Sequence, residues 1–380
     1  MSVTTAEQAS EIREMVRDFA TTEIAPHARE WDECSHFPRE VFRKLGELGL
    51  LGILVPEEYG GAGLTYRDYI AVLEELGAVE GGVALSVAAH NSLCTNHIFV
   101  FGNEAQRRAW LPGLASGEIL GAWGLTEPEA GSDAGATKTT ATRSGDGWVL
   151  RGSKNFTTHA SVGGVAVLTA RTSPGKDHRG ISAFIVPLDA AGVVRGKKED
   201  KVGMRISDTA SLLLEDCRLG ADALLGNEGD GFHQAMEVLD GGRISIAAMS
   251  VGIARGAFEA AVGYAKQRRQ FGRPIADFQA VRVKLADMAT AIAAARLLTE
   301  RAGEVKDAGG KTTLLSSQAK LFASETAVRV SEDAVQIHGG YGYIKDYPVE
   351  KFWRDSKLCT IGEGTSEIQR LVIAREIIGA

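Results

Sequence analysis

GVAVLTAR (residues 164–171) and ISAFIVPL (residues 181–188) are two short, mostly apolar runs in the middle of a sequence that elsewhere has helical periodicity. A third run, TASLLLEDC (residues 209–217), follows them, and turn-forming residues separate all three. Runs of this length and composition are typical of buried β-strands. Ahead of them, Ser144-Gly145-Asp146-Gly147 has the composition of a hairpin turn. Together these features predict a compact β domain over residues 121–225.

Helical periodicity dominates on both sides of this β-rich region. Apolar residues recur at helical spacing in four stretches: Ile12, Val16 and Phe19; Val41, Leu45 and Leu48; Tyr69, Val72, Leu73 and Leu76; and Val281, Leu285, Met288, Ile292 and Ala295. Another long helix is predicted from Thr312 to about Ile337, and Ser366 with Gln369 fits a capping box for the last helix.

The order of these segments defines the expected fold, which is mainly α with a central β domain. We expect an N-terminal helical domain (residues 1–120), a middle β-barrel-like domain (residues 121–225) and a C-terminal four-helix bundle (residues 226–380).

Composition is that of a soluble globular protein. The 380 residues are enough for two or three domains, and 44% hydrophobic against 24% charged residues can form a substantial core. The net charge of -7 argues against a nucleic-acid partner. No apolar run approaches the length of a membrane span, and the first residues lack the pattern of a secretory signal. We therefore expect a cytoplasmic protein that binds neither nucleic acid nor membrane.

The four cysteines, Cys34, Cys94, Cys217 and Cys359, are scattered along the chain without a Cys-x-x-Cys pair. This spacing favours neither a disulfide framework nor a zinc site. We expect reduced thiols and no bound metal.

IGEGTSEIQR (residues 361–370) places the carboxylate of Glu363 between two glycines, just before the last predicted helix. Glycine on both sides lets the backbone turn sharply and approach a ligand closely. A carboxylate held on such a turn is a candidate general base. The alternative is a flexible turn whose glutamate is simply solvated.

TEPEAGSDAG (residues 126–135), at the entry to the β domain, resembles together with IGEGTSEIQR the two best-known signatures of the acyl-CoA dehydrogenase family. Five further segments carry the same resemblance in the same order: GKKEDKVG (196–203), LDGGRI (239–244), RRQFG (268–272), FQAVR (278–282) and VQIHGGYG (335–342). The resemblance spans residues 11–378, and the chain is most similar to the short-chain, butyryl-type members.

The resemblance implies FAD-dependent α,β-dehydrogenation of a short- or medium-chain acyl-CoA, branched and cyclic acyl groups included, to the trans-2-enoyl-CoA. Glu363 would remove the α-proton, and flavin N5 would take the β-hydride. Electrons would pass to electron-transfer flavoprotein. Two alternatives are a short acyl-CoA oxidase, which uses oxygen, and a non-catalytic scaffold relative.

The resemblance also implies the residues that bind non-covalent FAD. One group lies in and near the β domain: Trp123, Leu125, Thr126, Ser132, Phe156 and Thr158. A second group would reach the FAD of a neighbouring subunit or face the same flavin from the C-terminal helices: Arg268, Gln270, Phe271, Gln279, Gln336, Gly339, Gly340, Thr365 and Glu367. Such sharing implies at least a dimer, and a homotetramer is the family norm. Without the family, Phe156 would be an ordinary core aromatic and residues 266–273 a solvated basic helix end.

The substrate side rests on the same resemblance, which matches Ser132, Asp240, Arg243 and Gly364 to acyl-CoA contacts. Three departures from the family pattern bear on it: Phe156 replaces the usual Trp, Gly362 replaces the usual Tyr before the base, and residues 81–93 hold no Arg or Lys that would bind a dicarboxylic acyl group. In isovaleryl-type relatives the base lies just before the helix arginine, and here Gly242 occupies that position. Gly362 therefore predicts a wider acyl pocket, and Glu363 is the remaining candidate base.

Overall fold

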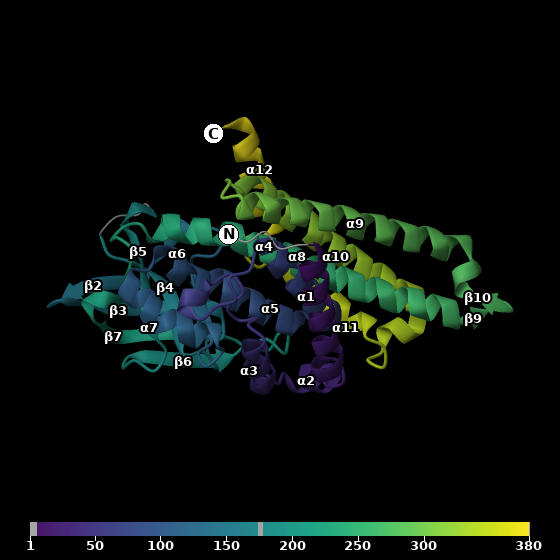
Figure 1. Cartoon of the computed structure of the whole chain (residues 1–380), viewed down its shortest axis with the longest axis horizontal. Coiled ribbons are helices and arrows are strands. Elements are labelled where there is room, and N and C mark those ends of the chain that lie inside the picture. Colours follow the sequence, from purple (N-terminus) through teal and green to yellow (C-terminus); the bar gives the residue numbers. More distant parts are fainter. Residues whose placement is uncertain (1–5, 174–177, 380) are drawn as a thin grey trace.

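A computed structural model describes residues 6–173 and 178–379, and Figure 1 shows their arrangement. The chain begins with short helices, continues into a sheet and ends in long helices. This order confirms the expected fold, helical at both ends with a β domain between.

The described part of the N-terminal region contains seven α-helices joined by turns and loops. They are α1 (Ala6–Phe19), α2 (Ala28–Cys34), α3 (Arg39–Glu47), α4 (Tyr66–Val79), α5 (Gly81–Ala88), α6 (Asn96–Phe101) and α7 (Glu104–Ala115), with π-helical turns at Ala20–Ile24 and Ala89–Thr95. A capping box of Thr65 and Asp68 begins α4. The predicted stripe on α4 is confirmed, because Tyr69 and Leu73 are fully buried. The stripe on α3 stops one residue early: Leu48 lies just past its end and is 42% exposed.

The β region is one eight-stranded mixed sheet in which the predicted strands are present. Its strands are β1 (Gly121–Gly124), β2 (Thr140–Ser144), β3 (Gly147–Thr158), β4 (Val165–Arg171), β5 (Ile181–Pro187), β6 (Val193–Lys198), β7 (Thr209–Leu219) and β8 (Leu224–Leu225). They run in the order β6-β7-β3-β2-β4-β5-β8, and β1 pairs in parallel with β4. The predicted hairpin is confirmed, since Ser144 pairs with Gly147 across a turn in which Gly145 has a φ of 61°. Trp148 packs edge-on against Phe184 in the core of this region.

The C-terminal region is dominated by three long helices, α8 (Gly231–Gln267), α9 (Gln279–Asp307) and α10 (Thr313–His338). They lie side by side, and α10 matches the predicted helix to within one residue at each end. The shorter α11 (Val349–Cys359) and α12 (Ser366–Ile378) pack against α10. Between α8 and α9, a ribbon of β9 (Arg269–Gln270) and β10 (Arg273–Pro274) forms a tip at the end opposite the sheet.

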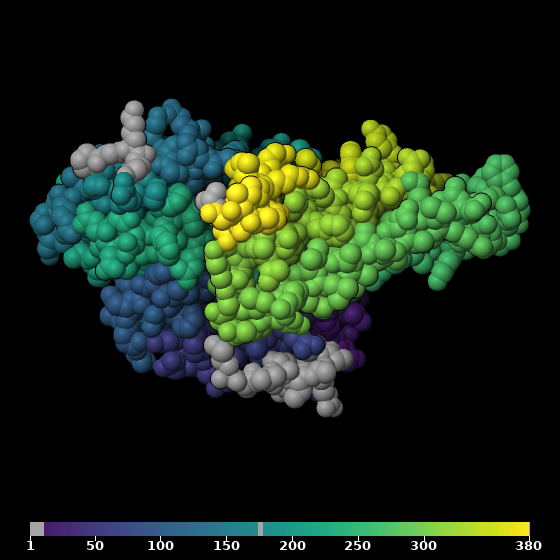
Figure 2. Space-filling model, turned by 90° about the horizontal axis from the view of Figure 1, so that it is seen from above, coloured from purple at the N-terminus to yellow at the C-terminus, as the bar shows by residue number. Residues whose placement is uncertain are grey.

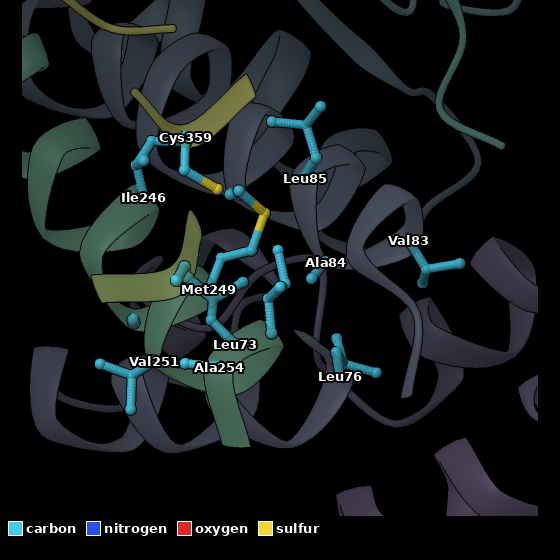
Figure 3. Packing of buried hydrophobic residues seen from close by; sticks show 14 of the residues in the cluster. Leu73, Leu76, Val83, Ala84, Leu85, Ile246, Met249, Val251, Ala254 and Cys359 are labelled. Carbon is cyan, nitrogen blue, oxygen red and sulfur yellow. The ribbon is translucent and has the colours of Figure 1, made fainter. Parts of the chain in front are cut away.

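α8 is the central helix of the molecule. It packs against α4, α9 and α10, and Leu73 and Leu76 of α4 gather with Met249 and Ala254 of α8 in the core shown in Figure 3. By length and composition α8 could cross a membrane, but 67% of its most apolar window is buried inside the protein, as expected for a core helix. Figure 2 shows α12 (yellow) on the surface, at the junction between the sheet region (teal) and the long helices (green).

Candidate active site

A cleft of about 1550 Å³ lies where the β domain meets α5, α8 and the turn between α11 and α12. We call it the main cleft. Ten of the predicted site residues line it: Trp123, Leu125, Thr126, Ser132, Phe156, Thr158, Arg243, Glu363, Gly364 and Thr365. The fold thus brings together residues that are up to 242 positions apart in the sequence, from Trp123 to Thr365.

The turn that carries Glu363 has an unusual backbone. Glu363 has a φ of 54° and Gly364 a φ of 94°, so two consecutive residues lie in the left-handed region. A non-glycine residue there costs free energy and persists only where its surroundings hold it, often at functional sites. Two side chains hold this turn: Gln369 Nε2 donates to the carbonyls of Glu363 (3.2 Å) and Gly364 (3.0 Å), and Lys320 Nζ donates to Gly364 O at 2.7 Å.

The cap of α12 differs from the predicted one. The hydroxyl of Thr365, not Ser366, accepts from the backbone N–H of Ile368 at 3.3 Å. Ser366 is the first helical residue, and the amide of Gln369 is engaged with the turn. The predicted capping box of Ser366 and Gln369 is therefore wrong by one residue, because the adjacent Thr365 competes successfully for the cap position.

Glu363 is partly buried, and one oxygen of its carboxylate points into the protein. Its Oε2 is buried without a hydrogen bond to any residue that the structure describes. It lies directly against Gly242 of α8, where an added Cβ would be 2.0 Å from Oε2. Burial raises the pKa of Glu363 to about 7, and the positive charges of Lys320 and Arg243 oppose this rise. The effect of burial on the pKa of Glu363 is therefore larger than the opposing effect of Lys320 and Arg243. The Glu363 carboxyl is expected to change its charge near neutral pH.

Arg243 and Asp240 form an ion pair beside the cleft. Arg243 Nη1 donates to Asp240 Oδ1 at 2.7 Å, and Thr313 Oγ1 donates to Asp240 Oδ2 at 2.6 Å. Arg243 is 5% exposed and lines the main cleft, whereas Asp240 is absent from its lining. Arg243 can thus face a ligand directly, and Asp240 fixes the orientation of Arg243. Their contacts with acyl-CoA remain predictions.

A chain of hydrogen bonds that was not predicted from the sequence holds Trp123 in place. Its Nε1 donates to His97 Nδ1 (3.0 Å), which makes His97 Nε2 the donor to Gln234 Oε1 (3.1 Å). Gln234 Nε2 in turn donates to Leu225 O at 3.1 Å. Burial lowers the pKa of His97 to about 4, so the imidazole is neutral and its tautomer is fixed by its two partners.

Phe156 is presented to the cleft by an irregularity in β3. The register of β3 against β7 shifts between Lys154 and Thr157, and Phe156 has a φ of 52°. Its side chain is 65% exposed, so the alternative of an ordinary core aromatic is wrong. Thr158 follows at the end of the strand and also lines the cleft. The bulge turns an aromatic face out of the sheet toward a ligand site.

A buried ion pair fixes the loop of residues 126–135. Glu127 accepts from Lys154 Nζ at 2.6 Å and from the backbone N–H of Lys138 at 2.6 Å. Lys154 is fully buried and also donates to Leu125 O (3.3 Å) and Thr169 Oγ1 (3.2 Å). Both charges are thus paired and hydrogen-bonded, which buried charges require.

Most of the second predicted group of cofactor residues lies away from the main cleft, and Thr365, which lines that cleft, is the exception. Arg268, Gln270, Gly339 and Gly340 line a cavity of about 550 Å³ at the β9–β10 tip. Further residues of this group are exposed: Phe271 on the tip, Gln279 at the start of α9, Gln336 near the end of α10 and Glu367 in the first turn of α12. Within one chain the predicted FAD contacts therefore fall into two separate places, an arrangement that suits a second copy of the chain.

Comparison with known proteins matches the chain along nearly its whole length. Models described as the N-terminal, middle and C-terminal domains of acyl-CoA dehydrogenase match residues 6–118, 122–217 and 229–378. The chain is 51% identical over 368 residues to the probable acyl-CoA dehydrogenase YngJ of Bacillus subtilis, covering 97% of each chain.

Solved structures agree with these matches. Butyryl-CoA dehydrogenase from Megasphaera elsdenii has a TM-score of 0.97 at 41% identity, with 100% of both chains covered. A chain in the structure reported as electron transferring flavoprotein of Acidaminococcus fermentans, a study of flavin-based electron bifurcation, has a TM-score of 0.98 at 45% identity, again over 100% of both chains.

Proposed function

Because this chain belongs to the acyl-CoA dehydrogenase family, we propose that it converts a short- or medium-chain acyl-CoA to the trans-2-enoyl-CoA. In this reaction Glu363 takes the α-proton, and the β-hydrogen leaves as hydride. The protein is then an oxidoreductase that acts on a CH–CH bond, as butyryl-CoA dehydrogenase is by its name.

The observation that carries this proposal is the carboxylate of Glu363 in the main cleft, whose Oε2 is buried without a hydrogen bond among the described residues. A carboxylate at its ordinary pKa is a weak base for a carbon acid, and burial corrects this by raising the pKa to about 7. At neutral pH a large share of the enzyme then has an ionised base that binds protons well. The unpartnered Oε2 leaves one oxygen free to accept the proton.

The residues of the main cleft fit FAD, held non-covalently. A cleft of about 1550 Å³ exceeds the range of roughly 300–1000 Å³ usual for one drug-sized ligand, so it can hold a flavin ring and an acyl thioester together. Trp123 and Phe156 offer aromatic surfaces, and Thr126, Ser132 and Thr158 offer hydroxyls. When bound, the flavin supplies the acceptor for the β-hydride.

The acyl group would lie among the apolar residues at the helical side of the cleft. Leu85, Ala89, Leu93, Leu239 and Ile246 line this side. A Cβ at Gly362 would meet its nearest atom, Leu358 O, at 3.7 Å, so a side chain fits where the glycine leaves space. This space favours branched or cyclic acyl groups beside straight chains. Gly364, Ser132, Arg243 and Asp240 are the proposed contacts of the thioester and CoA.

We assign electron-transfer flavoprotein as the electron acceptor, a homotetramer as the assembly and the cytoplasm as the location. The name of the Acidaminococcus structure supports the first assignment. The separate cavity at the β9–β10 tip, with Arg268 and Gln270 in its wall, supports an assembly in which a second copy completes the cofactor site. The buried, unpartnered Oε2 of Glu363 disfavours the scaffold alternative.

The test is reduction of the bound flavin. The purified protein is expected to show a flavin spectrum that bleaches under anaerobic conditions with one or more acyl-CoAs from a panel of straight, branched and cyclic acyl groups. Reoxidation by electron-transfer flavoprotein but slowly by oxygen identifies a dehydrogenase, and rapid reoxidation by oxygen identifies the oxidase. A flavin-loaded protein that no acyl-CoA bleaches contradicts the proposed function.

A further inference from the structure

Lys320 is a fully buried lysine in the first third of α10, next to the Glu363 turn. Its Nζ donates to the carbonyl of Gly364 at 2.7 Å, across 44 positions of sequence. It is absent from the residues that line the main cleft. Burying an ammonium group costs free energy because the group loses its hydration. Hydrogen bonds to specific partners in the protein must offset this cost.

The carbonyl that Lys320 binds belongs to the residue directly after the strained Glu363. Gly364 has a φ of 94° and directly follows Glu363, whose φ is 54°. Gln369 donates to the same carbonyl at 3.0 Å, so two donors from two helices meet on one oxygen. Gln369 also donates to the carbonyl of Glu363 at 3.2 Å. Lys320 and Gln369 together therefore hold the backbone that follows Glu363, whose carboxylate lies against Gly242.

The charge of Lys320 acts on the same carboxylate. The ionisable groups that act on Lys320 come from four neighbouring segments: Arg243 of α8, Cys359 of α11, Glu363 of the turn and Glu367 of α12. Burial lowers the pKa of Lys320 to about 8, which leaves it protonated at neutral pH. Its charge lowers the pKa of Glu363 and so opposes the effect of burial.

We propose that Lys320 is a positioning residue for proton abstraction: its ammonium group holds the Glu363–Gly364 turn and favours the ionised form of Glu363. This inference rests on the proposed role of Glu363 as the base. Lys320 does not touch the substrate, so it acts on the rate of reduction and on its pH dependence, with little effect on acyl-CoA binding.

The experiment compares Lys320→Met, which removes both donor and charge, with Lys320→Gln, which keeps a donor without the charge. The flavin-loaded variants are reduced anaerobically with the acyl-CoA that bleaches the wild type fastest, over a range of pH. In the pH profile of the reduction rate, the rise on the acid side should shift to higher pH by about one unit in both variants. The reason is that the Lys320 ammonium group no longer stabilises ionised Glu363. At high pH, Lys320→Met should be about 10-fold slower, and Lys320→Gln should lie between it and the wild type.

Lys311→Met is the matched control, because Lys311 is 74% exposed and pairs only with Glu376 among the described residues. It should reproduce the wild-type profile, and KM should change little in all three variants. If Lys320→Met does not yield folded holoenzyme, Lys320→Gln alone decides the matter. An acid limb that coincides with the wild type in the soluble Lys320 variants overturns the inference and leaves the proposed function intact. A wild type that no acyl-CoA reduces overturns both.

Discussion

The carboxylate of Glu363 rests on the bare backbone of Gly242, so that a methyl group at Gly242 would lie 2.0 Å from Oε2 and 2.9 Å from Cδ. In the family pattern, Gly242 and Glu363 are the two alternative positions for the base. The structure places the two positions next to each other, so a side chain at residue 242 would require the Glu363 carboxylate to move. Glu363 can turn into the cleft because residue 242 has no side chain.

This relationship predicts the effect of Gly242→Ala. The added methyl group must displace the Glu363 carboxylate, and a misplacement of about 1 Å reduces the rate of reduction by on the order of 100-fold. Gly263→Ala on the same helix is the control, since its Cβ meets no atom within 4 Å. Anaerobic flavin reduction measures both. A Gly242→Ala enzyme as fast as the control would show that the carboxylate is not confined there.

The buried pair of Glu127 and Lys154 predicts a large cost for removing one partner. Glu127→Gln or Lys154→Met leaves the other charge buried and unpaired, which destabilises a protein by about 3–5 kcal/mol. Because Glu127 anchors the loop of residues 126–135, we also expect loss of flavin. Thermal melting and flavin content measure these effects. The double variant should recover part of the stability, and equal losses in single and double variants would contradict the pairing.

The link between His97 and Trp123 predicts coupling between their substitutions. His97→Leu removes the acceptor of the indole N–H, which should weaken flavin or substrate binding by about 1 kcal/mol. In a Trp123→Phe background, which has no N–H to lose, the same change should have little further effect. Flavin and acyl-CoA titrations of the four proteins give the coupling. Additive effects would mean that the hydrogen bond does not position Trp123.

Ionised Glu363 should also lower stability. Its pKa, raised by burial to about 7, lies above that of the unfolded chain, so the folded state is disfavoured as the pH rises through this interval. At 1.36 kcal/mol per pKa unit, the full cost is roughly 3 kcal/mol and is present above about pH 7. Glu363→Gln should thus raise the melting temperature at pH 8 and leave it nearly unchanged at pH 4. The exposed Glu118→Gln is the control, and a Glu363→Gln protein that is no more stable at pH 8 would argue that the carboxylate is solvated.

Local sequence signals predicted the elements of this fold well. The runs at 164–171 and 181–188 form β4 and β5, and Thr312 to Ile337 matches α10, because strand and helix periodicities are local properties. The capping of α12 was predicted one residue late, since Thr365 and Ser366 are both good caps and only the fold decides between them.

The side chains that hold the site residues in place by hydrogen bonds could not be predicted in the same way. Lys320 meets Gly364 across 44 positions, Lys154 meets Glu127 across 27 and Trp123 meets His97 across 26. Helix and strand periodicities do not relate residues this far apart in the sequence. In the sequence alone, these lysines, this glutamate and this histidine have no feature that marks them as supports of the site. The residues proposed to contact a ligand could be predicted from family motifs, whereas the residues that hold them in place could be found only from the three-dimensional structure.

The most direct test of the central claim is the second-order rate of anaerobic flavin reduction at low, subsaturating acyl-CoA, measured against pH for the wild type and Glu363→Gln. Because the base must be ionised, the wild-type rate should rise with pH and reach half its maximum near pH 7, the pKa that burial gives Glu363. Glu363→Gln should still bind the acyl-CoA but be reduced slower by several orders of magnitude at every pH. A Glu363→Gln enzyme that is reduced at close to the wild-type rate, with the same dependence on pH, would show that the base lies elsewhere.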